Sequence, residues 1–154
     1  MNANFPILVL EDNPDDAFLL KRALKKNSIS NPVFIVRDGV EGIEYITGAG
    51  KFGDRDAFPS PGCIVADLKM PRLGGLEFLA WLRDHPDFAV IPTLVLSSST
   101  EDKDVAQAYS MGANSYLVKP TRFEDFEELV RIVHDYWTRC VRPQKPIKAQ
   151  KQAA

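Results

Sequence analysis

Short apolar runs alternate with helical patterns along the chain, and this alternation limits the possible folds more strongly than composition does. Apolar runs rich in Val, Ile and Leu and bounded by turn residues are typical of strands buried on both faces of a parallel sheet. Most of these runs end directly at a charged or hydroxyl-bearing residue. The predicted strands are residues 5–10, 33–36, 63–66, 93–96 and 116–118.

Alternation of strand and helix through five repeats predicts an α/β fold of the (βα)5 type. Such a chain forms a doubly wound, five-stranded parallel sheet with helices on both faces. Right-handed crossover connections leave few possible topologies. We expect the flavodoxin-like strand order 2-1-3-4-5, which places the first and third strands side by side at the switch point.

Several residues are typical of helix starts. Asn13 can cap a first helix, and Pro14 suits its first position. Ser99 or Thr100 can cap the fourth helix, and residues 121–124 (Thr-Arg-Phe-Glu) match a capping box for the fifth. These signals place three of the five expected helices, the first, fourth and fifth, shortly after a strand.

Length and composition indicate one globular domain without a membrane anchor. The chain has 154 residues, of which 45% are hydrophobic. A formal charge of −2 gives no general attraction to nucleic acid or to membranes. No apolar run approaches the roughly 18 residues of a spanning helix, and the N-terminus does not resemble a signal peptide. We therefore expect a cytoplasmic protein with a domain over residues 1–140, a polar loop at 48–61 and a disordered tail over 141–154.

Acidic residues follow two of the predicted strands. Glu11 and Asp12 follow the first strand, and Asp67 follows the third. Because parallel strands end at one edge of the sheet, these carboxylates should meet there. Mg²⁺ prefers oxygen ligands and keeps several waters, so one or two direct carboxylates are enough to hold it. The Glu11-Asp12 pair alone would fit a helix-capping turn equally well, but a third acid at another strand end favours a metal site.

The same edge should carry the groups needed for phosphoryl transfer. Asp67 is the candidate nucleophile, because a carboxylate can accept a phosphoryl group as an acyl phosphate. Lys119 can offset charge on the transferring oxygens, and a cis bond to Pro120 would aim it inward. Ser97 can donate a hydrogen bond to a phosphoryl oxygen. The simpler alternatives are a surface lysine at 119, a turn serine at 97 and ordinary strand packing for Tyr116.

Together these segments resemble the receiver domains of two-component response regulators. The resemblance covers residues 5–140 and rests on Glu11-Asp12, Asp67-Leu68-Lys69-Met70-Pro71 followed by Gly74-Gly75, Leu96-Ser97-Ser98, and Tyr116-Leu117-Val118-Lys119-Pro120. It implies that a sensor histidine kinase or a histidine phosphotransfer protein phosphorylates Asp67.

The resemblance also implies a ligand set and a switch. Mg²⁺ would be held by Asp12, Asp67 and the backbone carbonyl of Lys69, with Glu11 acting through water. Ser97 would move toward the phosphoryl group while Tyr116 turns inward. The protein would then act as a switch or phosphoryl carrier with self-catalysed phosphorylation and dephosphorylation, and not as an enzyme.

The acidic pair, the long loop and the aromatic residues Tyr136 and Trp137 look like the stand-alone receivers partnered with phytochromes. We expect a homodimer through the fourth helix, fifth strand and fifth helix, with both aromatics at the interface or, alternatively, covering the core. One other hypothesis is a magnesium-dependent phosphatase of the haloacid dehalogenase type, which needs an acid where Lys69 stands. Another is a metal-free pseudo-receiver, which would be expected to lack Asp67 or Lys119.

Overall fold

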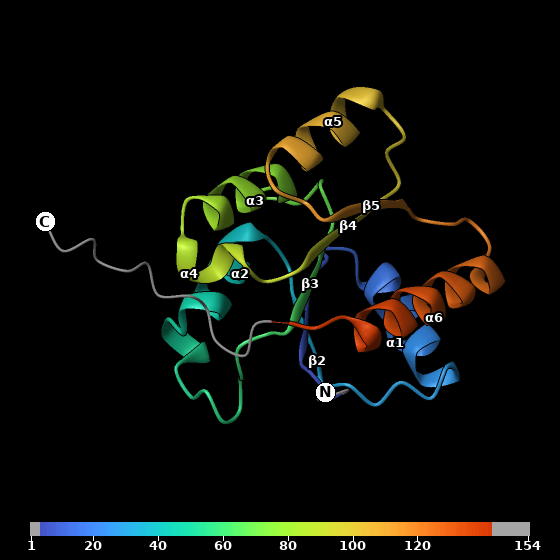
Figure 1. Cartoon of the computed structure of the whole chain (residues 1–154), viewed down its shortest axis with the longest axis horizontal. Helices are drawn as coiled ribbons and strands as arrows, with labels where there is room; N and C mark the ends of the chain where they lie inside the picture. The colour runs from blue at the N-terminus through green and yellow to red at the C-terminus, as the bar shows by residue number, and fades with distance from the viewer. Residues whose placement is uncertain (1–3, 143–154) are drawn as a thin grey trace, which may run out of the picture.

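The computed structural model describes residues 4–142, and its strands and helices alternate as the sequence predicts (Figure 1). The strands are β1 (Ile7–Leu10), β2 (Val33–Val36), β3 (Cys63–Ala66), β4 (Thr93–Ser97) and β5 (Ser115–Val118). The helices are α1 (Pro14–Lys26), α2 (Gly39–Thr47), the 3-10 helix η1 (Gly50–Phe52), α3 (Gly75–Arg83), α4 (Pro86–Ala89), α5 (Asp102–Ser110) and α6 (Phe123–Arg139). Within the described residues, no helix is long and apolar enough to cross a membrane. Most of the expected disordered tail, residues 143–154, lies outside the described range.

The five strands form one parallel sheet in the order β2-β1-β3-β4-β5, so the predicted topology is confirmed. Leu10, the last residue of β1, pairs with Val36 of β2 on one side and with Ala66 of β3 on the other. The ends of β1 and β3 therefore lie level with each other. As a result, the acidic residues that follow these two strands start from adjacent backbone positions.

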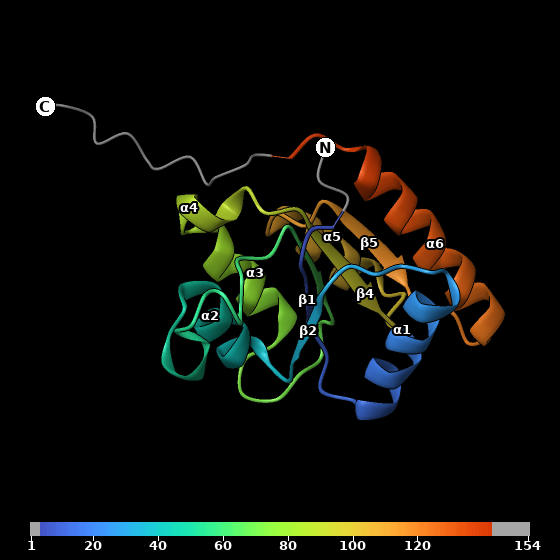
Figure 2. The same cartoon turned by 90° about the horizontal axis from the view of Figure 1, so that it is seen from below.

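Helices cover both faces of the sheet, as Figures 1 and 2 show. Helices α1 and α6 pack on one face, where Ile7 and Val9 of β1 join a buried cluster with Leu20 of α1 and Val130 of α6. Alternate residues of the same strand point to the other face and pack against α2 and α3. Both faces of β1 are thus buried, which explains why its sequence is continuously apolar rather than alternating.

The segment between α2 and β3 is more ordered than a polar loop. It contains η1, whose Phe52 is buried against Tyr45 of α2, with ring centroids 5.0 Å apart. The Arg55 guanidinium donates hydrogen bonds to the backbone oxygens of Tyr45 and Ile46, at 2.7 and 3.2 Å. These bonds cap carbonyls in the last turn of α2, where the Tyr45 carbonyl also accepts the N–H of Gly48. The sequence prediction of a loop here was therefore incomplete.

The predicted helix caps were correct for the first helix only. Asn13 caps α1 by accepting hydrogen bonds from the backbone N–H groups of Asp15 and Asp16, with Pro14 at the first helical position. The capping box expected at residues 121–124 was wrong, because α6 begins at Phe123 with no side-chain hydrogen bond at its cap. Helix α5 also begins later than expected, with Glu101 as its cap residue, and the short α4 was not predicted.

Candidate functional site

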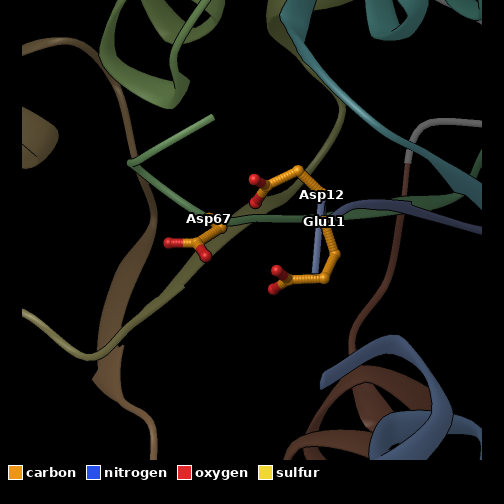
Figure 3. Close-up of side chains that lie close together, drawn as sticks. All are labelled: Glu11, Asp12 and Asp67. Carbon is orange, nitrogen blue, oxygen red and sulfur yellow. The ribbon is translucent and has the colours of Figure 1, made fainter. Parts of the chain in front are cut away.

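The carboxyl edge of the sheet gathers the acidic residues that follow β1 and β3. Glu11, Asp12 and Asp67 each offer a carboxylate oxygen, and these three oxygens lie within 4.8 Å of one another (Figure 3). Asp12 is exposed, Asp67 is half-buried and Glu11 is buried. Hard oxygen donors this close together match the ligand preference of Mg²⁺ and similar divalent cations. Like charges at such distances repel unless a cation joins them, so the donor set fits a metal.

Lys119 lies at the centre of the charged groups. Its Nζ donates hydrogen bonds to Glu11 Oε2 at 2.7 Å and to Asp67 Oδ2 at 3.0 Å. The lysine side chain is 15% exposed, so it is not the surface lysine of the simpler alternative. Its backbone N–H donates to the Ser97 carbonyl at 2.9 Å, which continues the pairing of β4 with β5 up to the site.

The expectation of a cis bond between Lys119 and Pro120 was wrong, because this peptide bond is trans. The lysine nevertheless reaches Asp67. The end of β5 is close enough to the end of β3 for an extended lysine side chain to bridge the intervening strand. The direction of the Lys119 side chain was therefore predicted correctly, although the cis bond from which it was argued is absent.

Burial alone would lower the pKa of Lys119, but its hydrogen bonds to Glu11, Asp16 and Asp67 outweigh burial and raise the pKa above the ordinary value. The ammonium therefore stays protonated across the neutral range. Glu11 shows the opposite balance. Burial raises the pKa of Glu11, although the hydrogen bond and the charge of Lys119 oppose the shift.

Asp16 belongs to the site but was not among the residues predicted from the sequence. Its Oδ2 accepts a third hydrogen bond from Lys119 Nζ, at 2.9 Å. From the sequence, Asp16 was interpreted as an acidic residue in the first turn of a helix, where it stabilises the helix dipole. That interpretation gave no reason to place Asp16 in the site. The available signal was its position one helical turn after Asp12, which brings it back toward the end of β1.

Glu11 is held by the protein at both carboxylate oxygens. Oε2 accepts from Lys119, and Oε1 accepts from the backbone N–H of Asn13 at 3.1 Å. Asp67 is held in a similar way, because its Oδ1 accepts from the backbone N–H of Leu68 at 2.7 Å. Asp12, by contrast, presents an exposed side chain beside both of them. This geometry leaves Asp12 as the carboxylate best placed to bind a cation directly.

The loop after Asp67 is fixed by contacts with α2. Arg72 Nε donates to Asp38 Oδ2 at 2.8 Å, and the Gly39 N–H donates to the Leu73 carbonyl at 2.8 Å. Burial alone would raise the pKa of Asp38, but hydrogen bonds from the backbone and from Arg72 lower it below the ordinary value. Asp38 therefore stays ionised near neutral pH. Lys69, in the same loop, has an exposed side chain, and metal binding by its carbonyl stays a prediction.

Ser97 and Tyr116 are connected through the backbone of Ser99. Ser97 is buried, and its Oγ accepts a hydrogen bond from the Ser99 N–H at 3.2 Å. The Tyr116 hydroxyl donates to the Ser99 carbonyl at 2.8 Å. A displacement of the Ser97 side chain would therefore shift Ser99, the residue whose carbonyl binds the Tyr116 hydroxyl. Their action as a switch pair stays a prediction.

Comparison with known proteins agrees with the resemblance noted in the sequence. The family model for the response regulator receiver domain matches residues 7–131. Response regulator Rcp1 from Synechocystis is 31% identical over 135 residues, which are 88% of this chain and 90% of Rcp1.

Three solved structures are also similar, and the alignment with this chain covers 99% of the length of each. A response regulator in red light signalling of R. palustris has 34% identity and a TM-score of 0.86 over 91% of this chain. The phosphorylated cyanobacterial phytochrome response regulator RcpA has 28% identity and a TM-score of 0.84 over 91%. The Mn²⁺-bound form of Rcp1 has 30% identity and a TM-score of 0.80 over 90%.

The close contact between Gly75 and the backbone after β3 yields a prediction about stability. A Cβ at Gly75 would clash with the Asp67 carbonyl oxygen and lie 2.9 Å from the Cα of Leu68. Since both neighbours are backbone atoms, Gly75→Ala should lower the free energy of unfolding by about 1–3 kcal/mol. Urea denaturation measures the loss.

Gly53→Ala is the matched control, because a Cβ at Gly53 would meet only ordinary contacts at 3.5 and 3.6 Å. Gly53 also has a φ of −66°, which any residue can adopt. Equal stability of the two variants would contradict the close approach of α3 to the residue after β3.

Proposed function

Because this chain belongs to the response regulator receiver family, we propose that it accepts a phosphoryl group on Asp67 from a sensor histidine kinase or a histidine phosphotransfer protein. Receiver domains are signalling switches. The similarity to the phytochrome response regulator RcpA and to a response regulator in red light signalling, over nearly the whole length of each, makes a phytochrome a candidate kinase. The protein would signal by a change of its own surface or by passing the phosphoryl group onward.

The contact of Lys119 Nζ with Asp67 Oδ2, at 3.0 Å inside the acidic cluster, is the observation that carries this proposal. In the reaction, an Asp67 oxygen forms a bond to phosphorus while the bond from phosphorus to the donor nitrogen breaks. The nitrogen leaves with the bonding electron pair. Lys119 offsets negative charge on the phosphoryl oxygens, and Ser97 donates a hydrogen bond to one of them.

A divalent cation fits the carboxylate cluster, and Mg²⁺ is our proposed cofactor. Asp12 and Asp67 would bind it by their side chains, Lys69 by its backbone carbonyl, and Glu11 through water. When bound, such a cation neutralises charge on the transferred group. A manganese-bound form of the relative Rcp1 supports a divalent site in this family.

The two alternative functions are less well supported. A phosphatase of the haloacid dehalogenase type needs a second acid two residues after the nucleophile, and that position is Lys69. A pseudo-receiver would be expected to lack the acceptor or the lysine, but Asp67 and Lys119 are both present and in contact. We therefore propose a phosphoacceptor switch that does not turn over an external substrate.

Phosphorylation of Asp67 can be tested directly. Asp67→Asn keeps the size of the side chain but removes the nucleophilic carboxylate, so labelling by acetyl phosphate or by a cognate kinase should be abolished. Circular dichroism should show that the fold is retained. Asp54 is an exposed aspartate in the segment between η1 and β3. The variant Asp54→Asn is therefore the control, and it should be labelled to the same extent as the wild type. Undiminished labelling of Asp67→Asn would refute the assignment.

Metal binding should depend unequally on the two neighbouring acids. Asp12→Ala should weaken Mg²⁺ binding by at least about tenfold, because a direct ligand is lost. Glu11→Gln should have a much smaller effect, because Glu11 is buried and is proposed to reach the cation only through water. Titration calorimetry measures both affinities. Equal losses would indicate that Glu11 binds the metal directly.

We also propose a homodimer through α5, β5 and α6, the face expected from the sequence. Tyr109, Val118, Ile132 and Tyr136 are large side chains on these elements that remain 43–65% exposed. Trp137 was expected either at the interface with Tyr136 or covering the core, and it is buried in the core beside Phe5. Of the two aromatics, only Tyr136 is available for a partner. Large aromatic side chains of this kind are enriched at protein interfaces.

Self-association should increase when the site carries beryllofluoride, a phosphoryl mimic. Tyr136→Ala should weaken the dimer by about tenfold, as expected for a central aromatic contact. Phe18→Ala is the matched control, because Phe18 lies on α1 and is 65% exposed, as Tyr136 is. Sedimentation equilibrium measures the dissociation constants. A strict monomer in both states, or an equal effect of Phe18→Ala, would contradict this interface.

A further inference from the structure

The Lys119 ammonium is fully occupied by carboxylates. An ammonium has three N–H donors. The side chains of Glu11, Asp16 and Asp67 accept from Nζ at 2.7, 2.9 and 3.0 Å. These acceptors come from three different elements, since Glu11 follows β1, Asp16 lies in α1 and Asp67 follows β3. Every donor of the lysine therefore has a partner before any phosphoryl group arrives.

Asp16 can bind Lys119 because it is not needed to accept the backbone N–H of Asn13, which Glu11 accepts instead. Asp16 is the third residue after the cap Asn13, the position from which a Glu or Gln side chain accepts the N–H of the cap residue in a capping box. Here Glu11 Oε1 accepts the Asn13 N–H instead, at 3.1 Å. The Asn13 side chain in turn accepts from the backbone N–H of Asp16, which fixes the start of the helix. The cap of α1 thus orients Asp16 toward the lysine.

The geometry points to Asp16 as a positioning residue that, together with Glu11, holds two of the three Lys119 donors and leaves the third for the group on Asp67. This inference rests on the proposed function. When Asp67 becomes an acyl phosphate, the donor now on Asp67 Oδ2 can pass to a phosphoryl oxygen. The other two donors keep the ammonium in place. In this proposal Asp16 acts through Lys119 and is not itself a ligand of the cation.

An isolated ion pair at the surface contributes little, and the Asp16 side chain is 39% exposed. Lys119, however, is only 15% exposed, and two other partners already restrict its motion. Ordering one more carboxylate against a fixed ammonium costs less entropy than ordering two free side chains. The third contact therefore confines the lysine further, whereas an isolated surface pair would not.

The test compares Asp16→Ala with Asp15→Ala. Each variant removes one acid from the first turn of α1, but Asp15 is exposed and contributes only its backbone N–H to the helix cap. Two quantities are measured in the full-length protein. The first is the acetylation rate of Lys119 by acetic anhydride, relative to the exposed Lys103 in the same sample. The second is the initial rate of phosphorylation by acetyl phosphate at saturating Mg²⁺.

In Asp16→Ala, acetylation of Lys119 should rise and phosphorylation should fall, each by about three- to tenfold, as expected for one charged hydrogen bond that is partly exposed. Asp16→Asn keeps an oxygen acceptor and should show a smaller effect on both rates. Asp15→Ala should behave like the wild type. A defect of the α1 cap alone would raise the acetylation of Lys119 to the same extent in Asp15→Ala, because Asp15 lies in the same first turn.

Equal Lys119 acetylation in Asp16→Ala and Asp15→Ala would overturn the inference. It would also be overturned if acetylation rises in Asp16→Ala while phosphorylation stays at the wild-type rate. A wild-type protein that takes no label would instead refute the proposed function. In that case, the acetylation of Lys119 still decides whether Asp16 holds the ammonium.

Discussion

Among residues 4–142, the ammonium of Lys119 is the one positive charge in contact with the carboxylates of Glu11, Asp16 and Asp67, and the arrangement of the sheet edge depends on it. Without this contact, acids brought together by adjacent strand ends would repel one another. The lysine joins the last strand of the sheet to the first strand, the first helix and the third strand. The same interaction therefore stabilises the fold at this edge and prepares it to receive another anionic group.

The parallel sheet explains why these residues meet although they are far apart in the sequence. Register places the end of β1 level with that of β3, and the ends of β4 and β5 are paired through Ser97 and Val118. Helices on both faces bury the strands, so substitutions within the strands would disturb the core. Ser97 connects the edge to Tyr116 through Ser99, which gives a route from the site to the face of α5, β5 and α6.

The sequence predicted the topology and most of the site because both follow from the positions of strand ends. Asp12, Asp67, Ser97 and Lys119 each lie at the end of a strand or within two residues of it, so a correct strand assignment places them together. Asp16 was missed because the helix dipole alone explains an acid in the first turn of α1. Its contact with Lys119 depends on how Asn13 and Glu11 share the cap of that helix. The trans bond before Pro120 and the burial of Trp137 likewise depend on three-dimensional packing.

Phosphoryl transfer to Asp67 is the central claim, and chemical trapping of the product tests it most directly. Borohydride reduces an aspartyl phosphate to homoserine, so the modified position can be located by peptide mass spectrometry. After treatment with acetyl phosphate and Mg²⁺, homoserine should appear at position 67 and at no other aspartate. Homoserine at Asp12 or at another aspartate, or its absence from a folded protein with bound Mg²⁺, would contradict this account.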